Sequence, residues 1–229
     1  MKKWVFICAS CFLGLLMSPI GFAQQGQKVT VSEILGERKE CYFDDDKAGE
    51  IPLNFQAALT GKGDQPRWVV KKIENAPTAD NVVVQTKLDA TDNRYSLLII
   101  NGVAYNDFAV YVRFRSEGGS VEQSGGLVFK YKDNNNYYVL RASVLEGNVK
   151  LLKFVNGTPT QLGEKSLKIN FKEWHLLKAI CQADKIQCFY ENKKVIEVTD
   201  STFDKGSVGF WTKSDAYTFF DDLLMQEMK

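Results

Sequence analysis

The sequence contains a single histidine, His175, in 229 residues, and this scarcity limits the chemistry open to the chain. A serine hydrolase triad would have to use this residue, and no Gly-x-Ser-x-Gly elbow accompanies it. His175 follows Trp174 at the expected start of a strand, where we predict a structural role. The sequence therefore contains no motif that requires catalysis.

An excess of charge of either sign is also missing. Lysine and arginine number 29, aspartate and glutamate 28, and the formal net charge is +1. A dedicated nucleic-acid-binding protein usually has a strongly basic face. The balance argues against nucleic acid as a partner.

Long apolar runs are absent except at the N-terminus. Lys2 and Lys3 precede the apolar run 4–17, and small residues lead to a cut near Ala23. This is the layout of a secretory signal peptide, and it is too short for a spanning helix. We therefore expect residues 1–23 to be removed, the net charge to become −1, and the protein to be secreted or periplasmic. No other segment predicts a membrane span.

Cysteine is scarce after residue 23, where only Cys41, Cys181 and Cys188 occur. A turn at 184–185 would place Cys181 and Cys188 directly opposite each other, and a turn at 183–184 would place them diagonally on one face. An exported protein can form a disulfide here, but two packed free thiols explain the pair equally well. Neither alternative gives Cys41 a partner, and no further ligand completes a metal site.

The chain has no internal repeat, no low-complexity tract and no interdomain linker. Residues 24–40 are polar and predict a flexible N-terminal segment, and residues 41–229 predict a single domain. A short helix is expected at 53–59. After residue 67 no stretch keeps a helical apolar period, whereas β-branched and aromatic runs recur between turn signals every 8–12 residues or so. The expected strands include 68–71, 82–87, 95–100 and 108–114.

The segment 125–157 predicts three strands joined by tight turns. If residues 133–136 form the first turn, Lys130 faces Val139 and Lys132 faces Tyr137. A turn at 146–148 then sets Lys153 beside Arg141. Because side chains alternate between the faces of a sheet, this register predicts one outward stripe, formed by Lys130, Lys132, Tyr137, Arg141 and Lys153.

This basic and partly aromatic stripe has two interpretations. It can be an ordinary solvated sheet face, or it can be a sugar-binding face on which the Tyr137 ring stacks against a pyranose. The cations would suit ring hydroxyls or an acidic sugar. Trp68 is the other aromatic residue that we place at such a face, whereas Trp211 is expected in the core.

Several motifs carry a family resemblance. Trp174-His-Leu with the following hairpin to Asn192-Lys193, the stretch Gly206-Ser-Val-Gly-Phe-Trp211-Thr, and Phe219-Phe-Asp-Asp-Leu223 resemble the bacterial 3-keto-disaccharide hydrolase domains. These belong to the concanavalin A-like (laminin-G/glucanase) group. The resemblance, which covers roughly residues 40–228, implies an all-β jelly-roll sandwich of two antiparallel sheets. Its motifs are mostly packing and turn positions, so they specify the fold better than the activity.

The resemblance also implies that one sheet binds or cleaves glycans. Retaining glucanases of this fold use a Glu-x-Asp-x-x-Glu strand, which supplies two carboxylates at the required spacing, and this chain has none. The acids available to a hydrolase or lyase are at expected turns or loop edges: Glu117, Glu122, Asp133 and Glu146.

Two acidic segments suggest a metal site. The carboxylates at 44–46 follow an expected first strand, and Asp221 lies in the last strand. Terminal strands of jelly rolls are commonly neighbours, so Asp44 and Asp221 could hold a structural calcium ion, which prefers oxygen ligands. The alternative is an acidic turn and an aspartate bonded to loop backbone, with no cofactor.

The sequence thus predicts an exported, non-catalytic carbohydrate-binding protein, whose partner is an oligosaccharide or polysaccharide. A glycoside hydrolase or lyase of the 3-keto-disaccharide type is the second hypothesis. An envelope module that binds another protein is the third.

Overall fold

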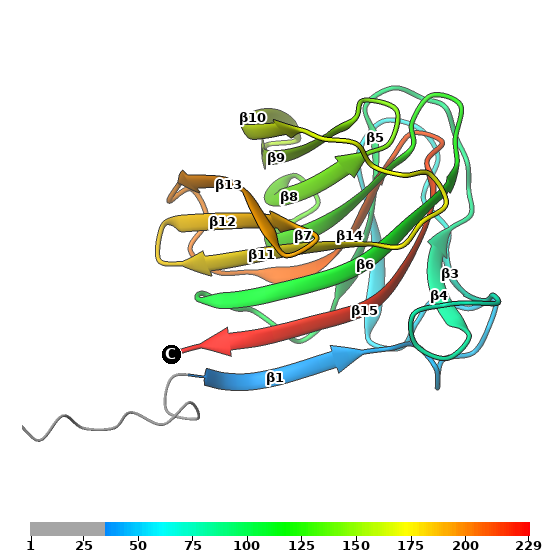
Figure 1. The fold of residues 1–229 in the computed structure, drawn as a ribbon, viewed down its shortest axis with the longest axis horizontal. Helices are drawn as coiled ribbons and strands as arrows, with labels where there is room; N and C mark the ends of the chain where they lie inside the picture. Colours follow the sequence, from blue (N-terminus) through cyan, green and yellow to red (C-terminus); the bar gives the residue numbers. More distant parts are fainter. Residues whose placement is uncertain (1–34) are drawn as a thin grey trace, which may run out of the picture.

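The computed structural model describes residues 35–229, so the expected signal peptide 1–23 and most of the segment 24–40 lie outside the described residues. The described chain contains no helix, and fifteen strands form two antiparallel sheets (Figure 1). Accordingly, no helix within 35–229 has the length and apolar character to cross a membrane.

The first sheet has eight strands in the order β13-β12-β11-β6-β15-β4-β3, and β1 pairs with β15. Figure 1 shows β1 and the C-terminal strand β15 side by side. The first and last strands are therefore neighbours, as expected. The first strand, however, is Leu35–Cys41 and does not begin at Cys41, so residues 35–40 belong to the sheet and not to a flexible segment. The strands of this sheet are β1 (Leu35–Cys41), β3 (Trp68–Lys72), β4 (Asn81–Gln85), β6 (Phe108–Gly118), β11 (His175–Gln182), β12 (Lys185–Tyr190), β13 (Lys193–Thr199) and β15 (Tyr217–Met228).

The second sheet has seven strands in the order β10-β9-β8-β7-β14-β5-β2. It contains the central segment of the sequence, whose three expected strands are β7, β8 and β9. The strands are β2 (Phe55–Gly61), β5 (Arg94–Ile100), β7 (Ser124–Asp133), β8 (Asn136–Ser143), β9 (Asn148–Val155), β10 (Thr158–Ser166) and β14 (Ser207–Lys213).

The main core lies between the two sheets. Phe210 of β14 stacks on Phe220 of β15, with ring centroids 4.9 Å apart, and Phe114, Leu127 and Leu140 are completely buried in the same cluster. Because strand residues alternate between faces, every second residue of β5, β7, β8 and β14 points the other way, onto the outer face of the second sheet.

That outer face holds a second apolar cluster, because the sheet curls on itself. The Tyr137 hydroxyl of β8 lies 3.0 Å from Oγ1 of Thr60 on β2, although three strands separate β8 from β2 in the sheet. The Tyr95 ring meets Phe154 at 4.9 Å. These contacts join distant strands across the face and bury eight side chains there: Tyr95, Leu97, Ile99, Val128, Tyr137, Val139, Phe154 and Trp211.

Some sequence predictions need correction. The helix expected at 53–59 is wrong, because this stretch enters β2 and pairs with β5. The predicted hairpin register is also wrong: Val139 pairs with Val128 and Arg141 pairs with Gly126, because an irregularity between Phe129 and Asp133 inserts extra residues in β7. The expected strands at 68–71, 95–100 and 108–114 are confirmed.

Candidate functional site

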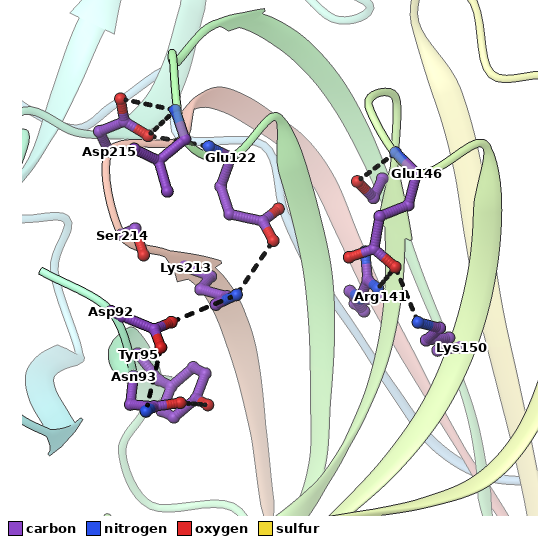
Figure 2. Close-up of polar contacts among 12 residues, drawn as sticks. Asp92, Asn93, Tyr95, Glu122, Arg141, Glu146, Lys150, Lys213, Ser214 and Asp215 are labelled. Carbon is purple, nitrogen blue, oxygen red and sulfur yellow. Dashed lines mark hydrogen bonds and ion pairs between the residues drawn. The ribbon is translucent and has the colours of Figure 1, made fainter. Parts of the chain in front are cut away.

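A pocket of about 290 Å³ opens on the outer face of the second sheet. Its floor comes from β5 and β14, where the Tyr95 and Trp211 rings stack with centroids 5.7 Å apart. Two groups of charged side chains stand on opposite sides of it (Figure 2). The lining residues are Tyr95, Glu122, Arg141, Glu146, Lys150, Leu152, Pro159, Gln161, Trp211 and Lys213.

Glu122 belongs to the first charged group and is brought there by a tight loop. The Asp215 carboxylate accepts hydrogen bonds from the backbone N–H groups of Ser120 (2.7 Å), Val121 (3.0 Å) and Glu122 (2.9 Å). Gly119 takes a φ of +127°, where an added Cβ would lie 1.8 Å from the Glu122 carbonyl oxygen. The loop is thus wrapped around one buried carboxylate, as Figure 2 shows.

The Glu122 side chain is only 7% exposed, and Lys213 donates to its Oε1 at 3.2 Å. Its second oxygen, Oε2, is buried with no hydrogen-bond partner. A buried acceptor without a partner is costly. Glu122 therefore keeps one unsatisfied acceptor in the lining of the pocket.

Arg141 leads the second charged group, on β8. Its Nη2 donates to Glu146 Oε2 at 2.6 Å, and Lys150 donates to the same oxygen at 2.7 Å. Burial raises the pKa of Glu146, but these hydrogen bonds outweigh burial and lower the pKa to about 2. Glu146 therefore stays ionised and anchors the two cations. Nη1 of Arg141 is buried without a partner.

The pocket lining thus holds three buried polar atoms without a partner: the acceptor Glu122 Oε2 and the donors Arg141 Nη1 and Trp211 Nε1. A sugar hydroxyl can donate to the first and accept from the second. The lysines and the arginine of the lining are each paired with one of the two glutamates.

The predicted stripe is largely dispersed in the structure. Arg141 does line the pocket, but Tyr137 is completely buried and stacked on Phe154 at 4.6 Å, because the sheet curls over it. Trp68 is also buried, packed against Phe220 in the main core. Neither ring is accessible to a sugar.

The three predicted lysines lie elsewhere. Lys130 is buried at the β7 irregularity with a φ of +48°, and its Nζ donates to the Ala183 carbonyl at 3.1 Å. Lys153 pairs opposite Tyr138 and donates to Asp200 at 2.6 Å. Lys132 is exposed and pairs with Asp204, next to a separate hollow of about 310 Å³.

Sequence reasoning named Glu122 and Glu146 only as acids for a hydrolase and did not connect them with Arg141. It missed Lys150, Lys213 and Tyr95. The expectation of a buried Trp211 is confirmed, because this residue is 1% exposed and belongs to the apolar cluster of the outer face. The other two candidate acids lie outside the pocket. Glu117 pairs with Arg115, and Asp133 accepts hydrogen bonds from the backbone N–H of Asn135 and the side-chain amide of Asn136.

Of the two alternatives for Cys181 and Cys188, the structure contains the free thiols and not the disulfide. The turn lies at 183–184, so Cys181 pairs with Ile186 and Cys188 with Ala179, a diagonal placement. Both thiols are free and buried, and Cys41 is free and half-buried. His175 is buried in the first sheet; Nε2 lies 2.8 Å from the Asn170 carbonyl oxygen and Nδ1 lies 3.0 Å from Glu191. It has the satisfied surroundings expected of a structural histidine.

The corner predicted for calcium contains Asp44 and Asp221, but its oxygen atoms already have donors. Asp221 is completely buried and accepts from the backbone N–H groups of Thr78 (3.2 Å) and Asp222 (2.8 Å). The carbonyl oxygens of the acidic turn accept from the Asn81 amide. Asp44 remains exposed. As these residues stand, they do not fit a calcium ion, and residues 35–229 contain no cluster of three or more acidic, histidine or cysteine ligands.

Comparison with known proteins identifies the fold. No protein-family model matches the chain. A levanase of Bacillus subtilis is 26% identical over 112 residues, which are 48% of this chain and 16% of the levanase, so the chain matches only a small part of that enzyme.

Two solved structures share the architecture. The carbohydrate-binding module CBM66 from Bacillus subtilis superposes with a TM-score of 0.57 and 21% identity, over 68% of this chain and 92% of the module. Domain 4 of an extracellular arabinanase from Geobacillus stearothermophilus, in complex with arabinotriose, has a TM-score of 0.51 and 14% identity, over 82% and 91%. The chain therefore has a concanavalin A-like β-sandwich fold, as the sequence motifs predicted.

Proposed function

We propose that this protein is an exported carbohydrate-binding β-sandwich, and that it binds a sugar in the pocket between Glu122 and Arg141 without cleaving it. The observation that carries this proposal is the pair of unpartnered buried atoms, Glu122 Oε2 and Arg141 Nη1, beside the Tyr95 and Trp211 rings. A few convergent polar groups in a concave, partly aromatic pocket are typical of small-ligand sites. The levanase, the module and the arabinotriose-bound domain support a saccharide as the ligand.

A neutral sugar fits the charges of the pocket better than the acidic sugar considered from the sequence. Glu146 pairs with Arg141 and Lys150, and Glu122 pairs with Lys213. Glu164 also lies 3.9 Å from Lys150 and Asp92 lies 3.7 Å from Lys213, so no cation of the pocket lacks a carboxylate. An added carboxylate would have to compete with Glu146 for the same donors. Neighbouring ring hydroxyls, by contrast, can use the free donor and the free acceptor together.

Binding without cleavage follows from the state of the carboxylates. A glycosidase needs one carboxylic acid that is protonated at the working pH, and its pKa is raised for that purpose. The low pKa of Glu146 excludes it from this role. Glu122 in turn accepts a hydrogen bond from the Lys213 ammonium group, so each glutamate of the pocket is paired with a cation.

Export rests on the signal-peptide pattern of residues 1–23, which the structure does not describe. An extracellular or periplasmic location is consistent with a polysaccharide as the ligand. Determining the N-terminal residue of the protein recovered outside the cytoplasm tests it, and a chain that still begins at Met1 would contradict export.

Isothermal titration calorimetry tests the binding site. We would titrate levan oligosaccharides, arabinotriose and acidic oligosaccharides into the wild type and into the Glu122→Gln and Arg141→Gln variants. Hydrogen bonds to charged groups are worth about 1.5–3 kcal/mol, so each variant should lose about 10- to 100-fold in affinity. Lys132→Gln, outside the pocket, is the matched control and should bind as the wild type does.

Equal binding by all variants would refute the assignment of the binding site to this pocket. If no sugar of the panel binds, these sugars are refuted as ligands. Release of reducing sugar during the titration, lost in Glu122→Gln, would instead establish the hydrolase hypothesis.

A further inference from the structure

The acidic turn after β1 is held by a single buried amide. Asn81, the first residue of β4, is 3% exposed, and its Nδ2 lies 2.8 Å from the Phe43 carbonyl oxygen, 3.2 Å from that of Asp44 and 3.1 Å from that of Asp46. Three backbone carbonyls therefore converge on one nitrogen. This arrangement is the kind of oxygen cradle in which proteins hold a hard cation.

The orientation of the amide is fixed by its surroundings. With Nδ2 toward the turn, the carbonyl oxygens receive donors, while Oδ1 of Asn81 is buried without a partner. The opposite orientation would place Oδ1 against three carbonyl oxygens, an arrangement that only an intervening cation would make favourable. The chain thus leaves Oδ1 unsatisfied in order to supply a donor to the turn.

The turn has a strained residue that needs such support. Phe43 has a φ of +66°, which is costly for a bulky side chain. This conformation directs its ring into the main core, where it lies 5.8 Å from Phe55 and 6.0 Å from Phe210. The bond from Asn81 to the Phe43 carbonyl ties that conformation to β4.

We infer that the Asn81 amide takes the place that a structural cation would occupy, so that this corner of the fold is held by hydrogen bonds and does not depend on calcium. The inference concerns stability and is independent of sugar binding. It also specifies what would restore a metal requirement. A carboxylate at position 81 would remove the donor and add an oxygen ligand to the three carbonyls.

Thermal unfolding of the full chain, with excess chelator and with calcium chloride, tests the inference. The wild type should unfold at the same temperature in both. Asn81→Asp should unfold several degrees lower in chelator and recover most of that loss with calcium, because a ligand that binds the folded state stabilises it. Asn81→Ala is the matched control, since it loses the donor without gaining a ligand, and calcium should not restore it.

A wild type that loses stability in chelator would overturn the inference, because a resident cation would then be present. So would an Asn81→Asp variant that is as stable as the wild type in chelator, or one that calcium fails to restore. If the variants do not fold, native mass spectrometry of the wild type decides: the metal-free mass in the presence of calcium supports the inference, and a bound calcium overturns it.

Discussion

Glu122 and Arg141 face each other across one pocket, and each keeps one buried polar atom without a partner. They come from different parts of the second sheet: Glu122 precedes β7, and Arg141 lies within β8. A ligand hydroxyl that donates to the glutamate oxygen and accepts from the arginine nitrogen would satisfy both atoms.

A deoxy analogue of the bound sugar should reveal which hydroxyl contacts Glu122. Removing that hydroxyl should weaken binding about tenfold in the wild type and have little further effect in Glu122→Gln, because the lost contact is the same one. Calorimetry of the four combinations measures the coupling. Additive losses would show that Glu122 and that hydroxyl do not touch.

Asp215→Ala should weaken binding although Asp215 does not line the pocket. Its carboxylate holds the backbone of residues 120–122, so its loss frees the loop that carries Glu122. We expect a loss of about tenfold in the wild-type background and almost none in Glu122→Gln, which separates positioning from general destabilisation. Equal losses in both backgrounds would contradict a positioning role.

Glu146→Gln should change the preference of the pocket. The substitution removes the anion shared by Arg141 and Lys150, so Arg141 loses its counter-charge and Lys150 keeps only Glu164, 3.9 Å away. Affinity for acidic oligosaccharides should rise relative to neutral ones, and the gain should shrink with added salt. Titrations at low and high ionic strength check both points, and an unchanged preference would contradict this account of the charges.

Tyr137→Ala should destabilise the protein rather than act on a sugar contact. The ring is completely buried between Phe154 and Thr60, so its loss should cost about 3–5 kcal/mol, as large aromatic truncations do. Tyr137→Phe keeps the ring and should cost only about 1 kcal/mol. Chemical denaturation measures both. A Tyr137→Ala variant with native stability and lost binding would restore the original stacking hypothesis.

Stability should fall as pH rises through the range of Asp221. Burial, together with the negative charge of Asp222, raises the pKa of this carboxyl to about 7, above its value of about 4 in an unfolded chain. Between these values the folded state binds the proton more strongly, so the stabilisation present at low pH is lost toward pH 7.

Asp221→Asn should therefore raise the unfolding temperature at pH 8 and change it little near pH 4, where the wild-type carboxyl is already neutral. A scan of unfolding temperature against pH for both proteins checks this. The expectation fails if the two curves run parallel.

The sequence predicted the strands and the sandwich well, because both depend on local alternation and turn chemistry. Two examples are the stretch Gly206–Thr212 and the hairpin that begins at Trp174, where the residue types favour a strand over other secondary structure. Arg141 was placed on the correct face because side chains along β8 alternate: Tyr138 and Leu140 join the main core, whereas Tyr137 and Val139 join the outer cluster.

The rest of the site depends on long-range geometry. Tyr137 was expected to be exposed, since alternation says which face a residue occupies but not that the sheet curls over that face. Lys130 was misplaced by the irregularity in β7, which no local signal marks. Glu122 reaches the pocket only because Asp215, 93 residues later, holds its loop. A carboxylate that accepts hydrogen bonds from several successive backbone N–H groups cannot be recognised from the amino-acid composition.

The lining of the pocket comes from both strands and loops. Its floor is formed by paired strands, whereas Glu122 lies in the loop before β7 and Glu146 in the loop after β8. Loops tolerate change far better than the ladders they connect. Ligand preference in this scaffold can thus be redesigned at a few loop positions while every strand pairing is left intact. The same strand framework could then serve as a starting point for binders of different glycans.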